Sequence, residues 1–129
     1  MGGEVAGALT PTVVLLPSTA LGTRLWREES FAPLRGLAIA DDARHAVALA
    51  NDSPFGLQAG VFTRDIQIAF RAHRELAVGG VIIGDVPTFR SDQMPYGGVK
   101  ASGVGKEGLR WAMQDLTHER IMVFSGVDL

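Results

Sequence analysis

The sequence predicts an α/β fold with mostly parallel strand pairing. Short runs of β-branched and aliphatic residues alternate with helical patterns of about ten residues, an order typical of parallel strands. The 129 residues are 47% hydrophobic and 20% charged, as in a folded domain or part of one. A net charge of -2 argues against a nucleic acid or an anionic membrane surface as partner.

The first half of the chain predicts two strands and a helix. Residues 12–16 (TVVLL) and 34–40 are the expected strands, and Asp41 is placed to cap a helix that runs to about Asn51. The apolar stripe of this helix consists of four residues at helical spacing: Ala43, Ala46, Val47 and Ala50.

The next elements continue the alternation. In order they are a turn at 53–56, a strand at 60–62, a helix capped by Asp65 and ended by Gly79–Gly80, and a buried strand at 81–83. The residues expected on one face of this helix are Ile66, Ala69, Phe70 and His73.

Residues 84–105 are rich in Gly and Pro and predict one long loop, which in a compact domain is usually functional. A third helix through Leu109 and Leu116 and a strand over Arg120 to Phe124 follow. Nothing in the sequence covers the second face of the sheet, so much of the apolar surface is expected to need material from elsewhere.

The loop contains Gly103-Val104-Gly105-Lys106-Glu107-Gly108, a literal G-x-G-x-x-G. A Rossmann site needs a hydrophobic strand directly before this motif, and residues 97–102 do not predict one. A P-loop is excluded as well, because Glu107 stands where a Ser or Thr would hold magnesium.

Absent residues exclude further chemistry. The chain has no cysteine, so it supplies no disulfide and no thiol nucleophile, and its three scattered His residues have no metal-ligand spacing. No basic segment precedes Arg24, and Pro11 and Pro17 interrupt the apolar N-terminus. A signal peptide and a membrane span are therefore not expected, and a cytoplasmic location is the default.

Residues 94–108 resemble the C-terminal signature of NAD(P)-dependent aldehyde dehydrogenases, P-[F/Y]-G-G-x-K-x-S-G-x-G-[R/K]-E. Three other stretches are similar to family motifs and occur in the family's order. They are residues 28–33 (EESFAP, for E-E-x-F-G-P), 50–57 (ANDSPFGL, for A-N-x-x-x-[Y/F]-G-L) and 115–120 (DLTHER, for [E/D]-x-T-x-x-[K/R]).

The resemblance implies a layer of the family's catalytic domain over residues 1–116 and an oligomerisation strand with a tail over 117–129. The family oxidises an aldehyde to a carboxylic acid through a cysteine thiohemiacetal and hydride transfer to NAD(P). Because this cysteine and the Rossmann domain precede the matched region in the family, we expect no catalytic residue here, no activity of the chain alone, and weak or no NAD(P) binding.

The same resemblance implies site residues. Glu29 matches the residue that binds the nicotinamide-ribose hydroxyls, and Phe31 the one that packs near the nicotinamide. Tyr96 matches an aromatic residue of the substrate tunnel, to which Phe89, Arg90 and Asp92 on the same loop are expected to contribute. Without the resemblance, Glu29 would be a solvated acid beside Arg27, Phe31 a core residue, and Arg90 an exposed salt-bridging residue.

Some matching residues are expected to be structural. Lys106, Glu107 and His118 lie where the family has an ion-pair cluster near subunit contacts. Two positions depart from the family: Ala32 replaces a glycine, and Gly84 replaces the asparagine after the buried strand, which is expected to loosen the loop.

Three classes of function stay open at this point. The chain is part of an enzyme, a non-catalytic interaction module that docks on intact aldehyde dehydrogenase subunits or on itself through residues 120–124, or a stand-alone α/β ligand-binding domain. The resemblance to members acting on small hydroxylated or phosphorylated aldehydes rests on residues 85–90 (DVPTFR).

Overall fold

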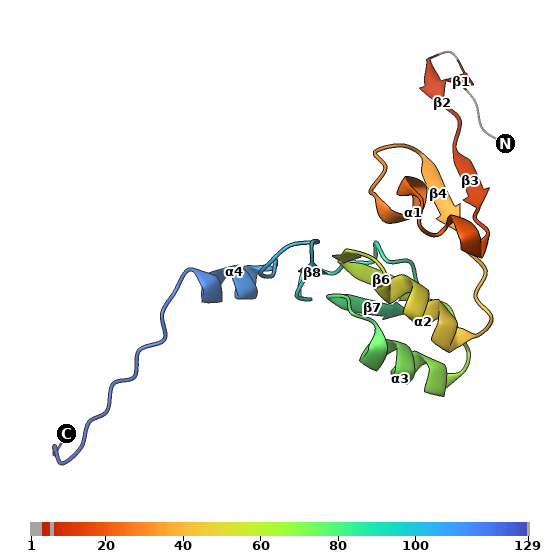
Figure 1. Cartoon of the computed structure of the whole chain (residues 1–129). Coiled ribbons are helices and arrows are strands. Elements are labelled where there is room, and N and C mark those ends of the chain that lie inside the picture. Colours follow the sequence, from red (N-terminus) through yellow and green to blue (C-terminus); the bar gives the residue numbers. More distant parts are fainter. Residues whose placement is uncertain (1–3, 6, 129) are drawn as a thin grey trace.

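The computed structural model describes residues 4–5 and 7–128 and has the predicted α/β architecture. Two parallel strand pairs form its framework: β3 (Thr12–Leu15) with β4 (Leu34–Leu37), and β6 (Gln58–Val61) with β7 (Gly80–Ile83). Figure 1 shows the two pairs in separate parts of the molecule rather than in one sheet. An N-terminal hairpin of β1 (Glu4–Val5) and β2 (Ala8–Leu9) was not predicted.

The crossover from β3 to β4 holds two short helices that the sequence patterns did not predict. They are the 3-10 helix η1 (Ser18–Ala20) and the one-turn helix α1 (Arg24–Arg27). Both are too short to show the periodic apolar pattern by which a helix is recognised. The segment that carries Glu29 and Phe31 directly follows α1.

Helix α2 (Ala43–Asn51) begins one residue later than predicted, since Asp42 rather than Asp41 caps it. The Asp42 carboxylate accepts the backbone N–H of His45 at 2.8 Å, and this bond lowers the pKa of Asp42. Asp41 instead contacts the His45 ring, with 3.1 Å between Oδ2 and Nδ1. Two successive aspartates made the two capping positions indistinguishable by residue type.

Helix α3 (Ile66–Glu75) is capped as predicted, with Asp65 Oδ1 accepting from the N–H of Gln67 at 2.8 Å. It ends at Glu75, so the prediction that Gly79–Gly80 end it was wrong: Gly80 begins β7. The buried residues are Ala69 and Ala72, whereas Ile66 and Phe70 are mostly exposed. The helix is therefore rotated from the predicted face by about one residue position.

The predicted loop over residues 84–105 contains one short regular element. Strand β8 (Val99–Lys100) pairs antiparallel with β5 (Phe55–Gly56), which lies inside the predicted turn. Helix α4 (Leu109–Asp115) follows. Residues 116–128 carry no helix or strand in the described chain, and Figure 1 shows this tail running away from the rest of the molecule.

The strand predicted over Arg120 to Phe124 is therefore not formed within the described residues of this chain. None of these five residues has a backbone hydrogen bond there, and their side chains are exposed, Ile121 by 87%. A strand needs a partner for its ladder, so its pairing with another subunit stays a prediction.

The core is very small. Leu16, Ala69 and Ala72 are the only buried hydrophobic residues of the described chain. The accessible surface of 10480 Å² is far larger than the ~6,600 Å² expected for a compact monomer of this mass. The strand predicted as buried, β7, is only half-buried, because nothing in the described chain covers its second face. Among the described residues no helix is long and apolar enough to cross a bilayer.

Candidate functional site

The site residues are positioned around the C-terminal end of α2, where the end of α3 and strand β8 meet it; we call this junction the hub. The Asn51 side chain joins the ends of the two long helices, since Nδ2 donates to the Glu75 carbonyl at 2.6 Å and Oδ1 accepts from the Ala77 N–H at 2.7 Å. Lys100 Nζ donates to the backbone carbonyls of Asn51 at 2.9 Å and Ser53 at 3.1 Å. A cation at a helix C-terminus satisfies carbonyls that have no partner in the helix.

The glycine-rich loop is fastened to the same hub. Ser102 Oγ accepts the N–H of the buried Gly56 at 2.8 Å, which ties the loop to β5. Lys100 has a φ of 58°, a left-handed conformation that aims its side chain at the end of α2. Two of the stretches that resemble family motifs, residues 50–57 and 94–108, are thus in direct contact.

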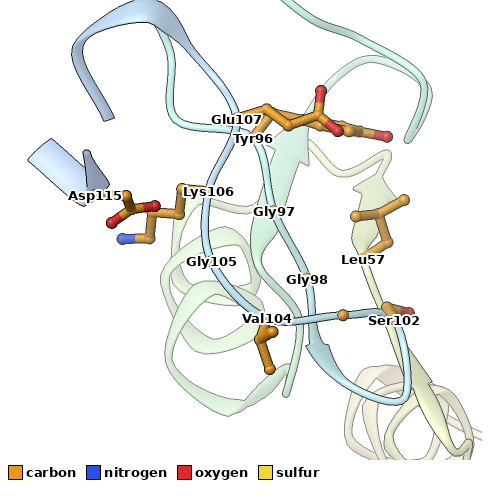
Figure 2. A pocket seen from close by; sticks show the side chains of 11 residues that line it. Leu57, Tyr96, Gly97, Gly98, Ser102, Val104, Gly105, Lys106, Glu107 and Asp115 are labelled. Atoms are coloured by element: carbon orange, nitrogen blue, oxygen red, sulfur yellow. The ribbon is translucent and has the colours of Figure 1, made fainter. Parts of the chain in front are cut away.

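The glycines of this loop serve close backbone packing. A Cβ at Gly79 would collide with the carbonyl of Gly97, and a Cβ at Gly97 would collide with the carbonyl of Gly105. Figure 2 shows residues 97–98 running beside the chain at residues 104–106. These residues line a hollow of about 250 Å³. The three glycines of the G-x-G-x-x-G instead have positive φ angles, of 126° at Gly103, 80° at Gly105 and 116° at Gly108, which side chains rarely adopt. The motif is preceded by a two-residue antiparallel strand instead of a Rossmann strand.

A second connection joins Asp52, at the end of α2, to Arg27 of α1, just before the segment that carries Glu29. Arg27 Nη1 and Nη2 donate to the backbone carbonyl and carboxylate of Asp52, each at 2.7 Å, and Arg27 Nε donates to the Leu21 carbonyl at 3.0 Å. The hydrogen bond between the Arg27 guanidinium and the Asp52 carboxylate lowers the pKa of Asp52 and raises that of Arg27. Arg27 is thus paired with Asp52 and not with Glu29, which is exposed, as the alternative interpretation of Glu29 as a solvated acid also expects.

The two consecutive glutamates have different surroundings. Glu28 accepts both of its hydrogen bonds from Arg24 Nε, each at 2.9 Å. Glu29 has no hydrogen bond or ion pair with any described residue. Both glutamates line a hollow of about 720 Å³, so they differ in their partners and not in their place. Phe31 is 97% exposed, so the alternative that it is a core residue was wrong for this chain.

Two of the three predicted substrate residues, Arg90 and Tyr96, are in contact. The Arg90 guanidinium lies over the Tyr96 ring at 4.4 Å from its centroid, and Arg90 Nη2 forms a 3.0 Å ion pair with Glu107. Tyr96 and Glu107 also exchange backbone hydrogen bonds, of 3.1 and 2.6 Å. Phe89 precedes Arg90 and is 46% exposed.

Glu107 therefore belongs with the predicted substrate residues, although sequence reasoning grouped it with Lys106 and His118. Figure 2 shows Tyr96 and Glu107 together, while Lys106 and Asp115 lie on the other side of the loop. Lys106 Nζ instead lies 5.2 Å from the centroid of the Trp111 ring. Of the described residues, no group of three or more His, Cys, Asp or Glu is arranged to hold a metal ion.

Comparison with known proteins decides the family. The model of the aldehyde dehydrogenase family matches residues 2–122. The chain belongs to the aldehyde dehydrogenase family. It is 44% identical over 126 residues to a 3-sulfolactaldehyde dehydrogenase from Priestia aryabhattai, a match that covers 97% of this chain and 26% of that protein. The chain thus spans about a quarter of the length of the curated relatives it matches.

Solved aldehyde dehydrogenases share the fold. Aldehyde dehydrogenase 21 from Physcomitrella patens, solved with the reaction product succinate, is 38% identical with a TM-score of 0.82 over 89% of this chain and 24% of its own. The glyceraldehyde-3-phosphate dehydrogenase GapN from Methanocaldococcus jannaschii, solved with NADP, is 35% identical with a TM-score of 0.79 over 89% of this chain and 25% of its own. Both similarities confirm the family and the partial α/β layer predicted from the motifs.

Proposed function

We propose that these residues form one wall of the active site in an aldehyde dehydrogenase that oxidises a small aldehyde to its acid with NAD(P). Residues 1–116 would be the C-terminal part of the catalytic domain, and residues 117–129 an oligomerisation strand and tail. The observation that carries this proposal is the difference between the two glutamates. Both line the same large hollow, but Glu28 is paired with Arg24, whereas Glu29 is left without a partner among the described residues.

The residues present fit the ribose end of the cofactor. A carboxylate accepts hydrogen bonds from two vicinal hydroxyls at once, which is what the nicotinamide ribose offers to Glu29. The exposed ring of Phe31 offers an apolar face near the same place. NAD(P), when bound, supplies the acceptor for the hydride. The chain has no cysteine, so the nucleophile would come from outside these residues.

Arg90 supports a substrate with a hydroxyl or anionic group. Its ion pair with Glu107 uses Nη2, and a planar guanidinium has further donors that match a carboxylate, phosphate or sulfonate. The relatives named for lactaldehyde and 3-sulfolactaldehyde are consistent with this substrate class. Phe89 and Tyr96 would then form the apolar wall of the tunnel beside Arg90.

The test is reconstitution. The purified chain alone should give no NADH or NADPH from lactaldehyde or 3-sulfolactaldehyde, because it has no thiol. Mixing or co-expressing it with the Priestia 3-sulfolactaldehyde dehydrogenase from which the matching quarter has been removed should restore aldehyde oxidation. Activity of the chain alone that survives purification would overturn our placement of the nucleophile.

A second outcome would favour the alternative of a non-catalytic module. The large exposed apolar surface supports docking on aldehyde dehydrogenase subunits whether or not catalysis results. If the chain binds the truncated relative tightly and activity does not return, docking without catalysis becomes the better account of its function.

A further inference from the structure

One face of strand β6 holds the loop that carries Phe89 and Arg90. Gln58 and Gly60 are two residues apart and so point to the same side of the strand. A Cβ at Gly60 would lie 2.6 Å from the carbonyl oxygen of Asp85 and 3.0 Å from Cδ of Pro87. The loop backbone therefore lies directly on β6, at a distance that only glycine permits.

Gln58 fixes the position of the loop at this contact. Its Nε2 donates to the carbonyl of Pro87 at 2.6 Å and to the carbonyl of Phe89 at 3.1 Å. A primary amide has two N–H donors, so one side chain satisfies two carbonyls that no secondary structure would pair. The backbone on both sides of Thr88 is therefore hydrogen-bonded to the same Gln58 side chain.

The neighbouring strand leaves room for this arrangement. Gly80 of β7 pairs in register with Gln58, and a Cβ at Gly80 would lie only 2.7 Å from the Gln58 Oε1 atom. A larger residue at position 80 would displace the amide. The loop therefore packs on a small surface formed by Gln58, Gly60 and Gly80.

We propose that Gln58 is a positioning residue for aldehyde binding, which acts by fixing the backbone of residues 87–89 and, through it, the direction of Phe89 and Arg90. The proposal rests on the proposed function for the identity of these two residues as substrate contacts. The far end of the loop is fixed separately, since Arg90 is bound to Glu107 and Tyr96. Loss of the Gln58 bonds should therefore loosen the near end and alter the geometry of the tunnel wall without detaching the whole loop.

The first test uses the chain itself. Gln58→Glu keeps the shape of the side chain and removes both donors, and Gln67→Glu makes the same change on α3, where Gln67 has no side-chain hydrogen bond to the described residues. Hydrogen exchange read by mass spectrometry reports on the Phe89 N–H, which donates to the Val86 carbonyl at 3.1 Å. We expect exchange in residues 84–90 to rise by roughly tenfold in Gln58→Glu, as loss of two ordinary hydrogen bonds implies, and to be unchanged in Gln67→Glu.

Unchanged exchange in residues 84–90 of Gln58→Glu would overturn the proposal, as would an equal increase over α2 and α3. If Gln58→Glu does not fold, Gly80→Ala provides the same test, because the added methyl group displaces the side-chain amide of Gln58 without substituting Gln58 itself. It should raise exchange in the same segment, and no change there would count against the proposal.

The second test uses the enzyme reconstituted with the truncated Priestia relative. Because Gln58 also lines the hollow of Glu29, both constants can change in Gln58→Glu, but we expect the KM for the aldehyde to rise by roughly tenfold and clearly more than the KM for NAD(P), a split that a general loss of structure would not give. Equal effects on both KM values would contradict a positioning role. If reconstitution with the unmodified chain restores no activity, the proposed function has failed, and the exchange experiment then decides independently whether Gln58 fixes the loop.

Discussion

Glu28 and Glu29 are adjacent acids with opposite surroundings, which makes them a matched pair for testing cofactor binding. In the reconstituted enzyme, Glu29→Gln should raise the KM for NAD(P) by roughly 10- to 100-fold, the usual effect of losing hydrogen bonds to a charged group. The KM for the aldehyde should change little. Glu28→Gln removes an exposed ion pair with Arg24 and should change the NAD(P) constant much less than Glu29→Gln does, because the carboxylate of Glu28 is already occupied by Arg24. Similar effects of the two variants on the NAD(P) constant would contradict the assignment of Glu29.

Asp52 links stability to pH through its bond with Arg27. Its pKa is lowered in the folded chain below the ordinary carboxyl value of about 4. A lowered folded pKa gives stability that is present above the unfolded pKa and is lost as pH falls through the folded pKa. We therefore expect Asp52→Asn to be less stable than the unmodified chain at neutral pH, with the difference shrinking below about pH 4.

Urea unfolding at a series of pH values measures this effect. Asp92→Asn is the control, because Asp92 lies exposed on the loop without an ion pair to the described residues. A difference between Asp52→Asn and the unmodified chain that stays constant down to pH 3 would show that the ion pair is not its source.

At the scale of elements, the connection between α2 and β8 depends on the side chain of a single residue, Lys100. Lys100→Met removes both bonds to the backbone carbonyls at the end of α2 and should lower the free energy of unfolding by roughly 1–2 kcal/mol. Lys106→Met is the matched control, expected to stay within about 0.5 kcal/mol because Lys106 bonds no carbonyl of the described chain. Urea unfolding in which the two variants lose equal stability would contradict the role given to Lys100.

Element-scale patterns were predictable where a single local signal defined them. Asp65 was identified as the cap of α3 because a lone aspartate precedes the helical pattern, whereas Asp41 and Asp42 competed at the start of α2. Gly84, expected to loosen the loop, adopts a φ of 81° and still donates its N–H to the Val61 carbonyl at 2.9 Å. Asparagine tolerates this left-handed conformation too, so the departure from the family preserves the turn.

The contacts that assemble the site were not predictable from local patterns. The bonds of Gln58 to Phe89, of Arg27 to Asp52 and of Arg90 to Glu107 join residues between 17 and 31 positions apart, and they follow from how the elements pack. The family motifs indicated Glu29 and Tyr96, and Arg90 was predicted from its place on the same loop, in each case without these partners. A polar residue two positions before Gly60, at the start of an otherwise apolar strand, was the one signal that could have identified Gln58.

At the scale of the whole molecule, the chain exposes the surface that a folded domain buries. Its few buried residues and large accessible area leave both faces of the strand pairs poorly covered, and Phe31, Val104 and Leu116 are almost fully exposed. Exposed apolar surface on this scale favours association, because burial of such area stabilises by roughly 25 cal/mol per Å². The tail adds the unpaired segment Ile121 to Phe124, a site for strand addition.

We therefore predict that the isolated chain is an oligomer, binds aldehyde dehydrogenase subunits, or aggregates. Removing residues 121–129 should shift it toward the monomer, because this removes five large exposed apolar side chains of the described residues together with the backbone that would add to a neighbouring sheet. Replacing Ile121 and Val123 by Lys, which keeps the length of the tail, separates the loss of apolar contacts from the loss of the backbone. Analytical ultracentrifugation measures the association state of all three chains. A stable, soluble monomer whose sedimentation ignores the deletion would contradict association through the tail and would favour a self-sufficient domain.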